Sequence, residues 1–144
     1  MPAHISVETT RSDDDLKIIT DGMRRYTESQ VPWTSYEDLT LYVRDESGAI
    51  VGGLLGETGR GWLHISVAWV TEECRGKGHG SALVQLAEQE AVRRGCHSAY
   101  LDTFSYQAKP FYERLGYEVF GTLDDYPPGH QRHYMRKRLS SVAT

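Results

Sequence analysis

Six residues near the middle of the chain, Arg75-Gly76-Lys77-Gly78-His79-Gly80, have the composition of a loop that binds a phosphorylated ligand. Glycines at alternate positions let the backbone approach a ligand without interference from a Cβ atom. A run with helical spacing follows, so the first amides of that helix and its dipole favour an anion such as a phosphate. Arg75 and Lys77 add positive charge at the rim. The loop therefore predicts a site for a phosphorylated cofactor.

Two other kinds of phosphate-binding loop fit these residues less well. A Walker A loop would end in Gly-Lys-Ser/Thr, which is missing at the required spacing. Gly76 and Gly78 match the start of a dinucleotide-binding G-x-G-x-x-G motif, and Asp102 follows at a plausible distance, but Ser81 stands where the last glycine belongs. The loop also arrives after about half of the chain, whereas a dinucleotide fold usually begins with its glycine turn.

A second segment, residues 105–117, supports the same interpretation as the glycine loop, and the two together indicate a known family. The loop resembles R-G-x-G-x-G, the pyrophosphate loop of the GNAT N-acetyltransferase superfamily, and the second segment is similar to that family's N-x-x-A-x-x-F-Y-x-x-x-G-F pattern. Ser105 replaces the usual Asn, and the matching positions are Ala108, Phe111, Tyr112, Gly116 and Tyr117. The resemblance covers about Leu39 to Leu139.

The resemblance implies a mixed α/β (α+β) fold, in which residues 1–144 form a single domain around a central, largely antiparallel sheet flanked by helices. A splayed pair of parallel strands would hold acetyl-CoA, the acetyl donor. Its pantetheine arm would pair with the main chain of Trp69, Val70 and Thr71, and Ser105 would replace the Asn that often contacts this arm. Its pyrophosphate would be bound by Arg75, Gly76, Lys77, Gly78, His79, Gly80 and Ser81.

The implied reaction is direct transfer of an acetyl group from a thioester to an amine. An alkylamine is mostly protonated near pH 7, so a base must accept a proton, and a donor helps the departing thiolate. The phenol of the family's F-Y pattern nominates Tyr112 as that donor. Arylalkylamine acetyltransferases of this family use a pair of histidines on the strand before the loop; His64 matches the first, and Ser66 occupies the second position. His64 is therefore the candidate base, with Asp102 as the alternative.

The expected acceptor is a small cationic primary amine, because the chain is short and mildly acidic, with a formal charge of −4. Tyr26, Trp33, Tyr36 and the corner at residues 124–126 could line its pocket. Three alternatives stay open: an acetyltransferase of protein amines, a non-catalytic acyl-CoA-binding or interaction module, and a dinucleotide-binding protein, which preferential binding of NAD over CoA would support.

The composition narrows the class of protein. With 144 residues and 39% hydrophobic content, the chain is long enough for one domain. No apolar run is long enough to span a membrane, and there is no signal-peptide pattern. Cys74 and Cys96 do not form a metal or redox motif, so we expect no metal and a cytoplasmic setting. The negative charge argues against nucleic acid, and the family resemblance allows a homodimer.

The elements that position these residues are predicted as one mixed sheet with helices. Apolar residues Leu83, Leu86, Ala87 and Ala91 recur at helical spacing after the loop. Gly52 and Gly53 within a strand suggest a bulge or the close approach of a ligand. The expected strands are residues 5–8, 39–44, 49–55, 63–70, 99–103, 117–123 and 132–138, and the expected helices are residues 80–94, 110–115 and one that Ser12 caps and that ends at Tyr26 or Thr27.

Overall fold

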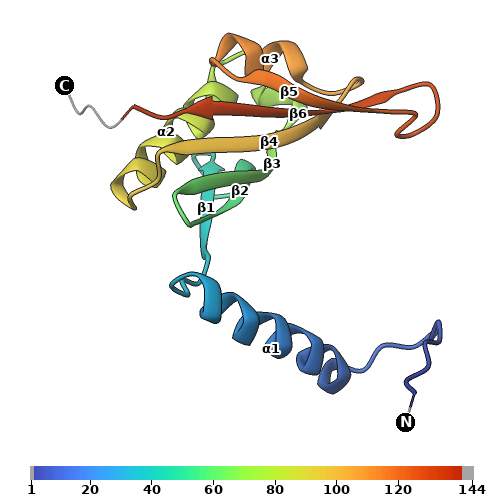
Figure 1. The fold of residues 1–144 in the computed structure, drawn as a ribbon. Coiled ribbons are helices and arrows are strands. Elements are labelled where there is room, and N and C mark those ends of the chain that lie inside the picture. The colour runs from blue at the N-terminus through green and yellow to red at the C-terminus, as the bar shows by residue number, and fades with distance from the viewer. Residues whose placement is uncertain (1, 141–144) are drawn as a thin grey trace. The chain divides into compact units, whose positions relative to one another are not determined.

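The structure, a computed structural model, describes residues 2–140. The chain forms two compact units, one that ends at Thr34 and one that begins at Ser35 (Figure 1). The expectation that the whole chain is a single domain stays a prediction. Within the described residues no helix is long and apolar enough to cross a membrane.

The first unit contains α1 (Asp13–Gln30). Ser12 caps this helix as predicted, and its side chain accepts a hydrogen bond from the backbone nitrogen of Asp15 at 3.4 Å. The helix ends later than predicted, because Arg24 and Glu28 form an i,i+4 ion pair of 3.0 Å across its last turns. It ends where Val31 is forced into an extended conformation by the proline that follows it. The strand predicted over residues 5–8 is wrong, because β-propensity alone, without a paired strand, does not form one.

The second unit contains a six-stranded sheet in the order β1-β2-β3-β4-β6-β5. Neighbouring strands are antiparallel except for the central β3 and β4, which are parallel. This arrangement confirms the mixed, largely antiparallel sheet expected from the sequence. The strands are β1 (Glu37–Arg44), β2 (Ile50–Gly59), β3 (Trp62–Val70), β4 (Ser98–Phe104), β5 (Glu118–Asp124) and β6 (Gln131–Arg138).

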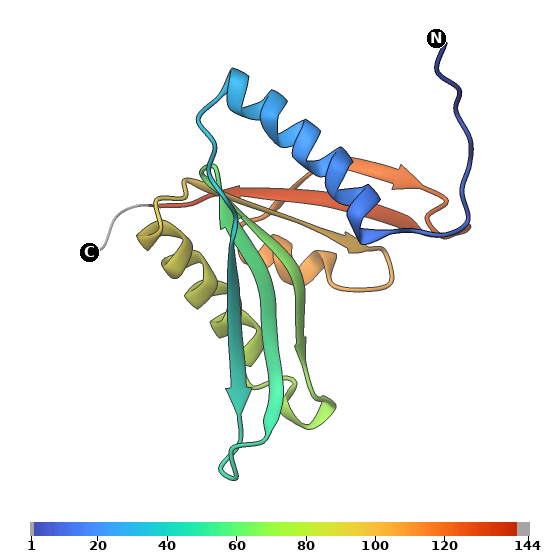
Figure 2. The ribbon, with the colours of Figure 1, turned by 90° about the horizontal axis from the view of Figure 1, so that it is seen from below.

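The parallel pair separates part of the way along its length. The pairing runs from Trp62 opposite Ser98 to Ile65 opposite Leu101, and beyond it β3 continues to Val70 without a partner in β4. Figure 2 shows the two strands diverging from the end at which they pair. The predicted splayed pair is therefore confirmed, and one edge of β3 is left without a strand neighbour among the described residues.

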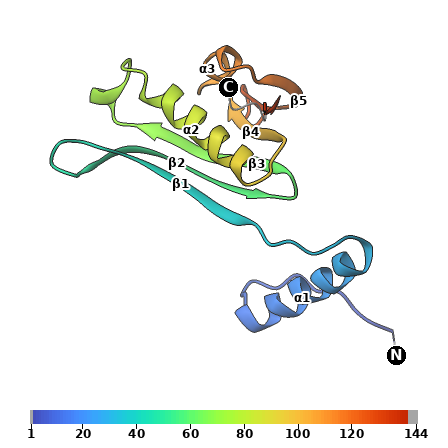
Figure 3. The same ribbon diagram turned by 90° about the vertical axis from the view of Figure 1, so that its left-hand side faces the viewer.

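Two helices of this unit contribute to one buried cluster with the sheet. The helix α2 (His79–Arg93) lies along one face of β1–β3 (Figure 3), and α3 (Lys109–Arg114) precedes β5. A short turn, η1 (Glu72–Cys74), separates β3 from the glycine loop. Leu63 and Ile65 of β3 are buried in this cluster, so the side chains that alternate with them face the opposite side of the sheet. Other members of the cluster are Leu83, Val84, Ala87, Ala91, Ala99, Leu101, Tyr112 and Met135.

The close approach expected at Gly52 and Gly53 is made by neighbouring strands. A Cβ atom on Gly52 would lie 2.7 Å from Cγ1 of Val70, and one on Gly53 would lie 2.6 Å from the carbonyl oxygen of Leu41. A bulge does occur beside Gly52, because Val51 has no partner in β1. A second bulge, which the sequence did not predict, falls on β3 at Ser66.

Candidate active site

The glycine loop between β3 and α2 has the backbone conformation that a cofactor cradle requires. Gly76 and Gly78 have φ angles of +76° and +85°, in the left-handed region that favours glycine. A Cβ atom added to either of them would meet no atom within 4 Å, so the loop faces open space. Gly78 is also the N-cap of α2, so the first amides of that helix point out of the loop.

A cavity of about 570 Å³ lies against this loop. It brings together most of the residues predicted to bind the cofactor: Trp69, Val70, Arg75, Gly76, Gly78, His79, Gly80 and Ser81, with the predicted proton donor Tyr112. Ala68, Cys74, Ala108, Phe111 and Arg114 complete its lining. Lys77, Thr71 and Ser105 are predicted cofactor residues that do not line it. The structure thus joins the two sequence segments, the loop and residues 105–117, around one space.

The residues present fit acetyl-CoA on two observations. The glycine loop is open where its backbone would approach a pyrophosphate, because a Cβ atom on Gly76 or Gly78 would meet no atom within 4 Å. The edge of β3 beyond Ile65 carries backbone groups that face away from β2 and have no strand neighbour. An extended pantetheine arm can pair with such an edge as an added strand does.

The hydroxyl of Ser105, a predicted cofactor contact, is hydrogen-bonded within the protein. Its hydroxyl accepts a hydrogen bond from the backbone nitrogen of Gln131 at 3.0 Å and lies 3.2 Å from Nδ1 of His130. The short hydroxyl therefore closes the β5–β6 hairpin against the end of β4. An Asn side chain at this position could reach farther, whereas the shorter serine side chain does not extend into the cavity.

Tyr112 lies on α3 where its ring joins the buried cluster and its side chain lines the cavity. It is 8% exposed, with edge-on contacts to Phe111 and Tyr117 at ring-centroid distances of 5.1 and 5.8 Å. Burial raises the pKa of the Tyr112 phenol above its ordinary value. The hydroxyl therefore keeps its proton at neutral pH and can act as a hydrogen-bond and proton donor.

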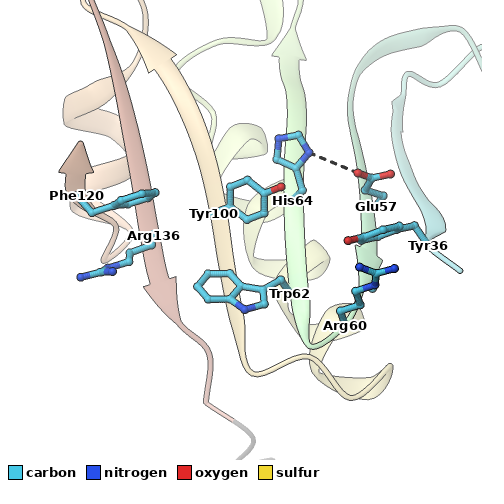
Figure 4. Close-up of a pocket in the computed structure, with 9 residues that line it drawn as sticks. Tyr36, Glu57, Arg60, Trp62, His64, Tyr100, Phe120 and Arg136 are labelled. Carbon is cyan, nitrogen blue, oxygen red and sulfur yellow. Dashed lines mark ion pairs between the residues drawn. The ribbon is translucent and has the colours of Figure 1, made fainter. Parts of the chain in front are cut away.

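His64 lies on the opposite face of β3, because it alternates with the buried Leu63 and Ile65. Its Nδ1 is 3.8 Å from a carboxylate oxygen of Glu57 on β2, and its ring stacks on Tyr100 of β4 at a centroid distance of 4.6 Å. These side chains line a second cavity of about 340 Å³, shown in Figure 4. Tyr36, Gly59, Arg60, Trp62, Phe120 and Arg136 complete its lining.

The bulge at Ser66 lies between the two cavities along β3. Ile65 pairs with Gly56 and Val67 with Leu55, so Ser66 has no partner in β2. It is also the first residue after the parallel pairing with β4 ends. Bulges of this kind often lie beside active sites, where they redirect the strand. The bulge interrupts the strict alternation of side chains at Ser66, and the shared face of His64 and Ser66 stays a prediction.

Asp102, the alternative base, forms a structural ion pair. One of its carboxylate oxygens accepts a hydrogen bond from Nε of Arg132 at 2.7 Å. The same guanidinium lies over the ring of Phe104 at 5.2 Å and over that of Tyr126 at 5.0 Å. Because this carboxylate is already engaged by a cation, the geometry favours His64 over Asp102 as the proton acceptor.

Of the residues expected around the acceptor, only Tyr36 lines the second cavity. Tyr26 and Trp33 belong to the first unit, and the corner that contains Tyr126 is part of the β5–β6 hairpin outside the cavity. Several lining residues were not predicted from the sequence, among them Glu57, Trp62, Tyr100 and Phe120. Alternation from His64 could have indicated Trp62. Glu57 and Tyr100 need the pairing of β3 with both of its neighbours, and Phe120 needs the order in which β4, β6 and β5 pair.

The described residues contain no group of three or more His, Cys, Asp or Glu side chains placed to hold a metal ion. Cys96 is buried and Cys74 lies at the cofactor cavity, and both are free thiols.

Comparisons with known proteins agree with the geometry. The model of the Acetyltransferase (GNAT) family matches residues 7–117. The chain is 35% identical over 123 residues to Acetyltransferase Atu2258 of Agrobacterium fabrum, covering 85% of this chain and 90% of that protein. It is 39% identical over 104 residues to Blasticidin-S acetyltransferase of Streptomyces morookaense, covering 72% of this chain and 76% of that protein. The crystal structure of an acetyltransferase from Bacillus cereus superposes with a TM-score of 0.86 at 34% identity, covering 95% of this chain and 98% of that chain.

Proposed function

This chain belongs to the acetyltransferase (GNAT) family and is an N-acetyltransferase, and we propose that it transfers an acetyl group from acetyl-CoA to the amine of a small molecule. One observation carries the proposal: a single strand, β3, has a cradle for a phosphorylated cofactor at its end and a histidine paired with a carboxylate on its other face. The proposed proton donor and cofactor residues therefore line one cavity, and the proposed proton acceptor lines a second cavity on the other face of β3, just before β3 leaves β4.

The residues that would hold acetyl-CoA are the glycine loop and the end of β3. Amides of Gly76, Gly78 and Gly80 would bind the pyrophosphate, with the charge of Arg75 beside them. Main-chain groups of Trp69 and the neighbouring residues would pair with the pantetheine arm. Bound acetyl-CoA would supply an acetyl thioester, which the amine nitrogen would attack with loss of the CoA thiolate.

Tyr112 supplies a proton from the buried side of the sheet. Its raised pKa keeps the phenol protonated at neutral pH, which is the state that a donor needs. A thiolate that leaves within the cavity would meet this hydroxyl. The neighbouring ring of Phe111, 5.1 Å away between centroids, keeps the phenol in place.

His64 accepts a proton from the incoming amine on the outer face. In a neutral imidazole one ring nitrogen carries hydrogen and the other is free to accept. The Glu57 carboxylate lies 3.8 Å from Nδ1 and orients this side of the ring toward β2, which leaves Nε2 as the acceptor. Glu57 is therefore a positioning residue for His64.

A small molecule is favoured as the acceptor because the second cavity, called the outer cavity from here on, is concave and lined by aromatic side chains from three strands and the residue before β1. A volume of about 340 Å³ is at the lower end of the range for small-molecule sites. The relative named Blasticidin-S acetyltransferase supports the same class, since its name gives a small-molecule acceptor.

The proposal is tested by measuring thiol release from acetyl-CoA with a panel of amines, including blasticidin S, arylalkylamines, polyamines, aminoglycosides and a lysine peptide. We expect release with a small-molecule amine and an increase of the melting temperature by acetyl-CoA. A rise in melting temperature without release by any amine would support the non-catalytic binding module instead. Release with the lysine peptide alone would support a protein acceptor, and the absence of any thermal shift would refute the cofactor site.

A further inference from the structure

We propose that the acceptor bound in the outer cavity is an amine carried by a flat, unsaturated ring, with its ring among the aromatic side chains and its amine at Glu57 and His64. This inference rests on the proposed function, which it makes more specific. It separates ring-bearing amines from polyamines, aminoglycosides and lysine side chains.

The walls of the outer cavity are aromatic. Trp62 and Tyr100 meet edge-on at a centroid distance of 5.9 Å, and Tyr100 stacks on His64. Tyr36 and Phe120 lie on opposite sides of this group in Figure 4. The ring of Tyr36 can lie on the backbone of β2 because Gly59 has no side chain; a Cβ atom there would come within 2.7 Å of Cε1 of the tyrosine. Such walls bind a planar ring by stacking and edge contacts.

Arginines hold the two outer aromatic side chains in place. The guanidinium of Arg136 lies over the ring of Phe120 at 5.2 Å and donates a hydrogen bond to Glu118 at 3.2 Å. The guanidinium of Arg60 lies over the ring of Tyr36 at 5.5 Å. These contacts orient the rings before a ligand binds, which lowers the entropy that binding must remove.

The charges of the cavity favour an acceptor with a single ammonium group. Among the lining residues Glu57 is the one carboxylate, whereas Arg60 and Arg136 are both cationic. A polyamine or an aminoglycoside carries several positive charges and would place some of them near these guanidiniums, which is unfavourable. A ring with one ammonium group can place that group at Glu57 and keep its apolar part away from the arginines.

The position of the cavity puts the amine near the point where β3 and β4 separate. Two residues of a strand span about 7 Å, so His64 lies about that distance from Ser66, where the parallel pairing has just ended. A flexible link of one or two carbons between ring and amine would let the nitrogen reach past His64 toward Ser66. The inference therefore favours arylalkylamines and related heteroaromatic amines.

The test measures binding as well as turnover. Tryptamine and spermidine are titrated by calorimetry into the CoA-saturated protein and into the variants Tyr36→Ala and Phe120→Ala, and kcat/KM is measured for both amines. Both side chains are half-exposed, so their removal spares the core. Tyr42→Ala is the matched control, because this tyrosine is equally exposed (55%) and lies on β1 outside the cavity.

We expect tryptamine to bind more tightly than spermidine, and each cavity variant to weaken tryptamine binding roughly three- to tenfold while the control leaves it unchanged. Affinity for acetyl-CoA should stay the same in all variants. Equal or tighter binding of spermidine, or tryptamine binding that neither variant changes, would overturn the inference. Because binding is read without turnover, a failure of acetyl transfer itself would refute the proposed function separately.

Discussion

The role of Tyr112 as a proton donor can be tested by removing a single oxygen atom. In Tyr112→Phe the ring keeps its packing against Phe111 and Tyr117, and only the hydroxyl is lost. Burial is the cause of its raised pKa, and no side chain of the described residues is bound to the hydroxyl. We therefore expect the free energy of unfolding to change by less than about 0.5 kcal/mol, since no hydrogen bond within the protein is broken.

The expected loss in kcat is roughly ten- to hundredfold, or about 1.4–2.8 kcal/mol in activation free energy. This lies at or below the usual range for general acid catalysis, because a thiolate can leave without help more easily than an alkoxide can. Affinity for acetyl-CoA should remain within about twofold, since the donated proton matters only as the carbon–sulfur bond breaks.

The raised pKa of the Tyr112 phenol predicts how kcat of the wild type depends on pH. The protonated phenol is the active form of a donor, and burial raises its pKa above the ordinary 10.0. In the wild type this group should therefore not cause a loss of kcat as the pH rises toward 10. Without the donor, the rate depends on the unaided departure of the thiolate at every pH.

Tyr117→Phe is the matched control for this experiment. Tyr117 is also buried, but its hydroxyl donates a hydrogen bond to Glu88 at 2.8 Å and does not line the cofactor cavity. This variant should lose about 1.5–3 kcal/mol of stability, the range for a hydrogen bond to a charged group, and keep its kcat. Thiol-release kinetics and thermal unfolding measure both properties. An unchanged kcat in Tyr112→Phe, or equal losses of kcat in the two variants, would refute the donor role.

Three further predictions follow from the loop and from two side-chain networks. Gly78→Val should weaken acetyl-CoA binding at least tenfold by calorimetry, whereas Gly48→Val, at an equally open turn position with φ +86°, should destabilise the fold by a similar roughly 1–2 kcal/mol and bind acetyl-CoA normally. Glu88→Ala removes the carboxylate that accepts hydrogen bonds from buried Tyr117 and from Lys137, and it should lower the free energy of unfolding in chemical denaturation by about 1–3 kcal/mol; a smaller loss would mean that water replaces the carboxylate. Hydrogen bonds from two arginines lower the pKa of Glu90 to about 2, so its stabilising charge should be complete above pH 4.5 and be lost as the pH falls through about 2; carboxyl NMR showing a midpoint near 4.5 would contradict the pairing.

The glycine loop and the F-Y segment could be predicted because their signals are local. Positive φ angles at Gly76 and Gly78 and the end of α3 at Gly116 depend on residues close in the sequence. The splay of the central strands was predicted through the family resemblance and is confirmed by the pairing that stops at Ile65. The helix after the loop was predicted nearly to its bounds, although Leu86 is exposed and Val84 is buried in its place.

Other parts of the molecule depend on contacts between distant segments. The strand expected at residues 5–8 fails for this reason, since its propensity is not matched by a partner. The function of Ser105 was predicted from its position in a motif, but its hydroxyl is bound to the hairpin that follows 25 residues later. Likewise, Asp102 became a structural group because Arg132 reaches it from β6.

The sequence by itself therefore determined the reaction class, through the family resemblance, and the conformation of the glycine loop, because a short run of glycines before a helix fixes its own backbone and its own amides. Only the tertiary structure decided what surrounds His64, the proposed base. Glu57, His64 and Tyr100 stand on three different strands, and they meet because β2 pairs antiparallel and β4 parallel with β3 at this register. The register of a sheet is set by long-range pairing and by bulges such as that at Ser66, and a shift by one residue would turn each of these side chains to the opposite face.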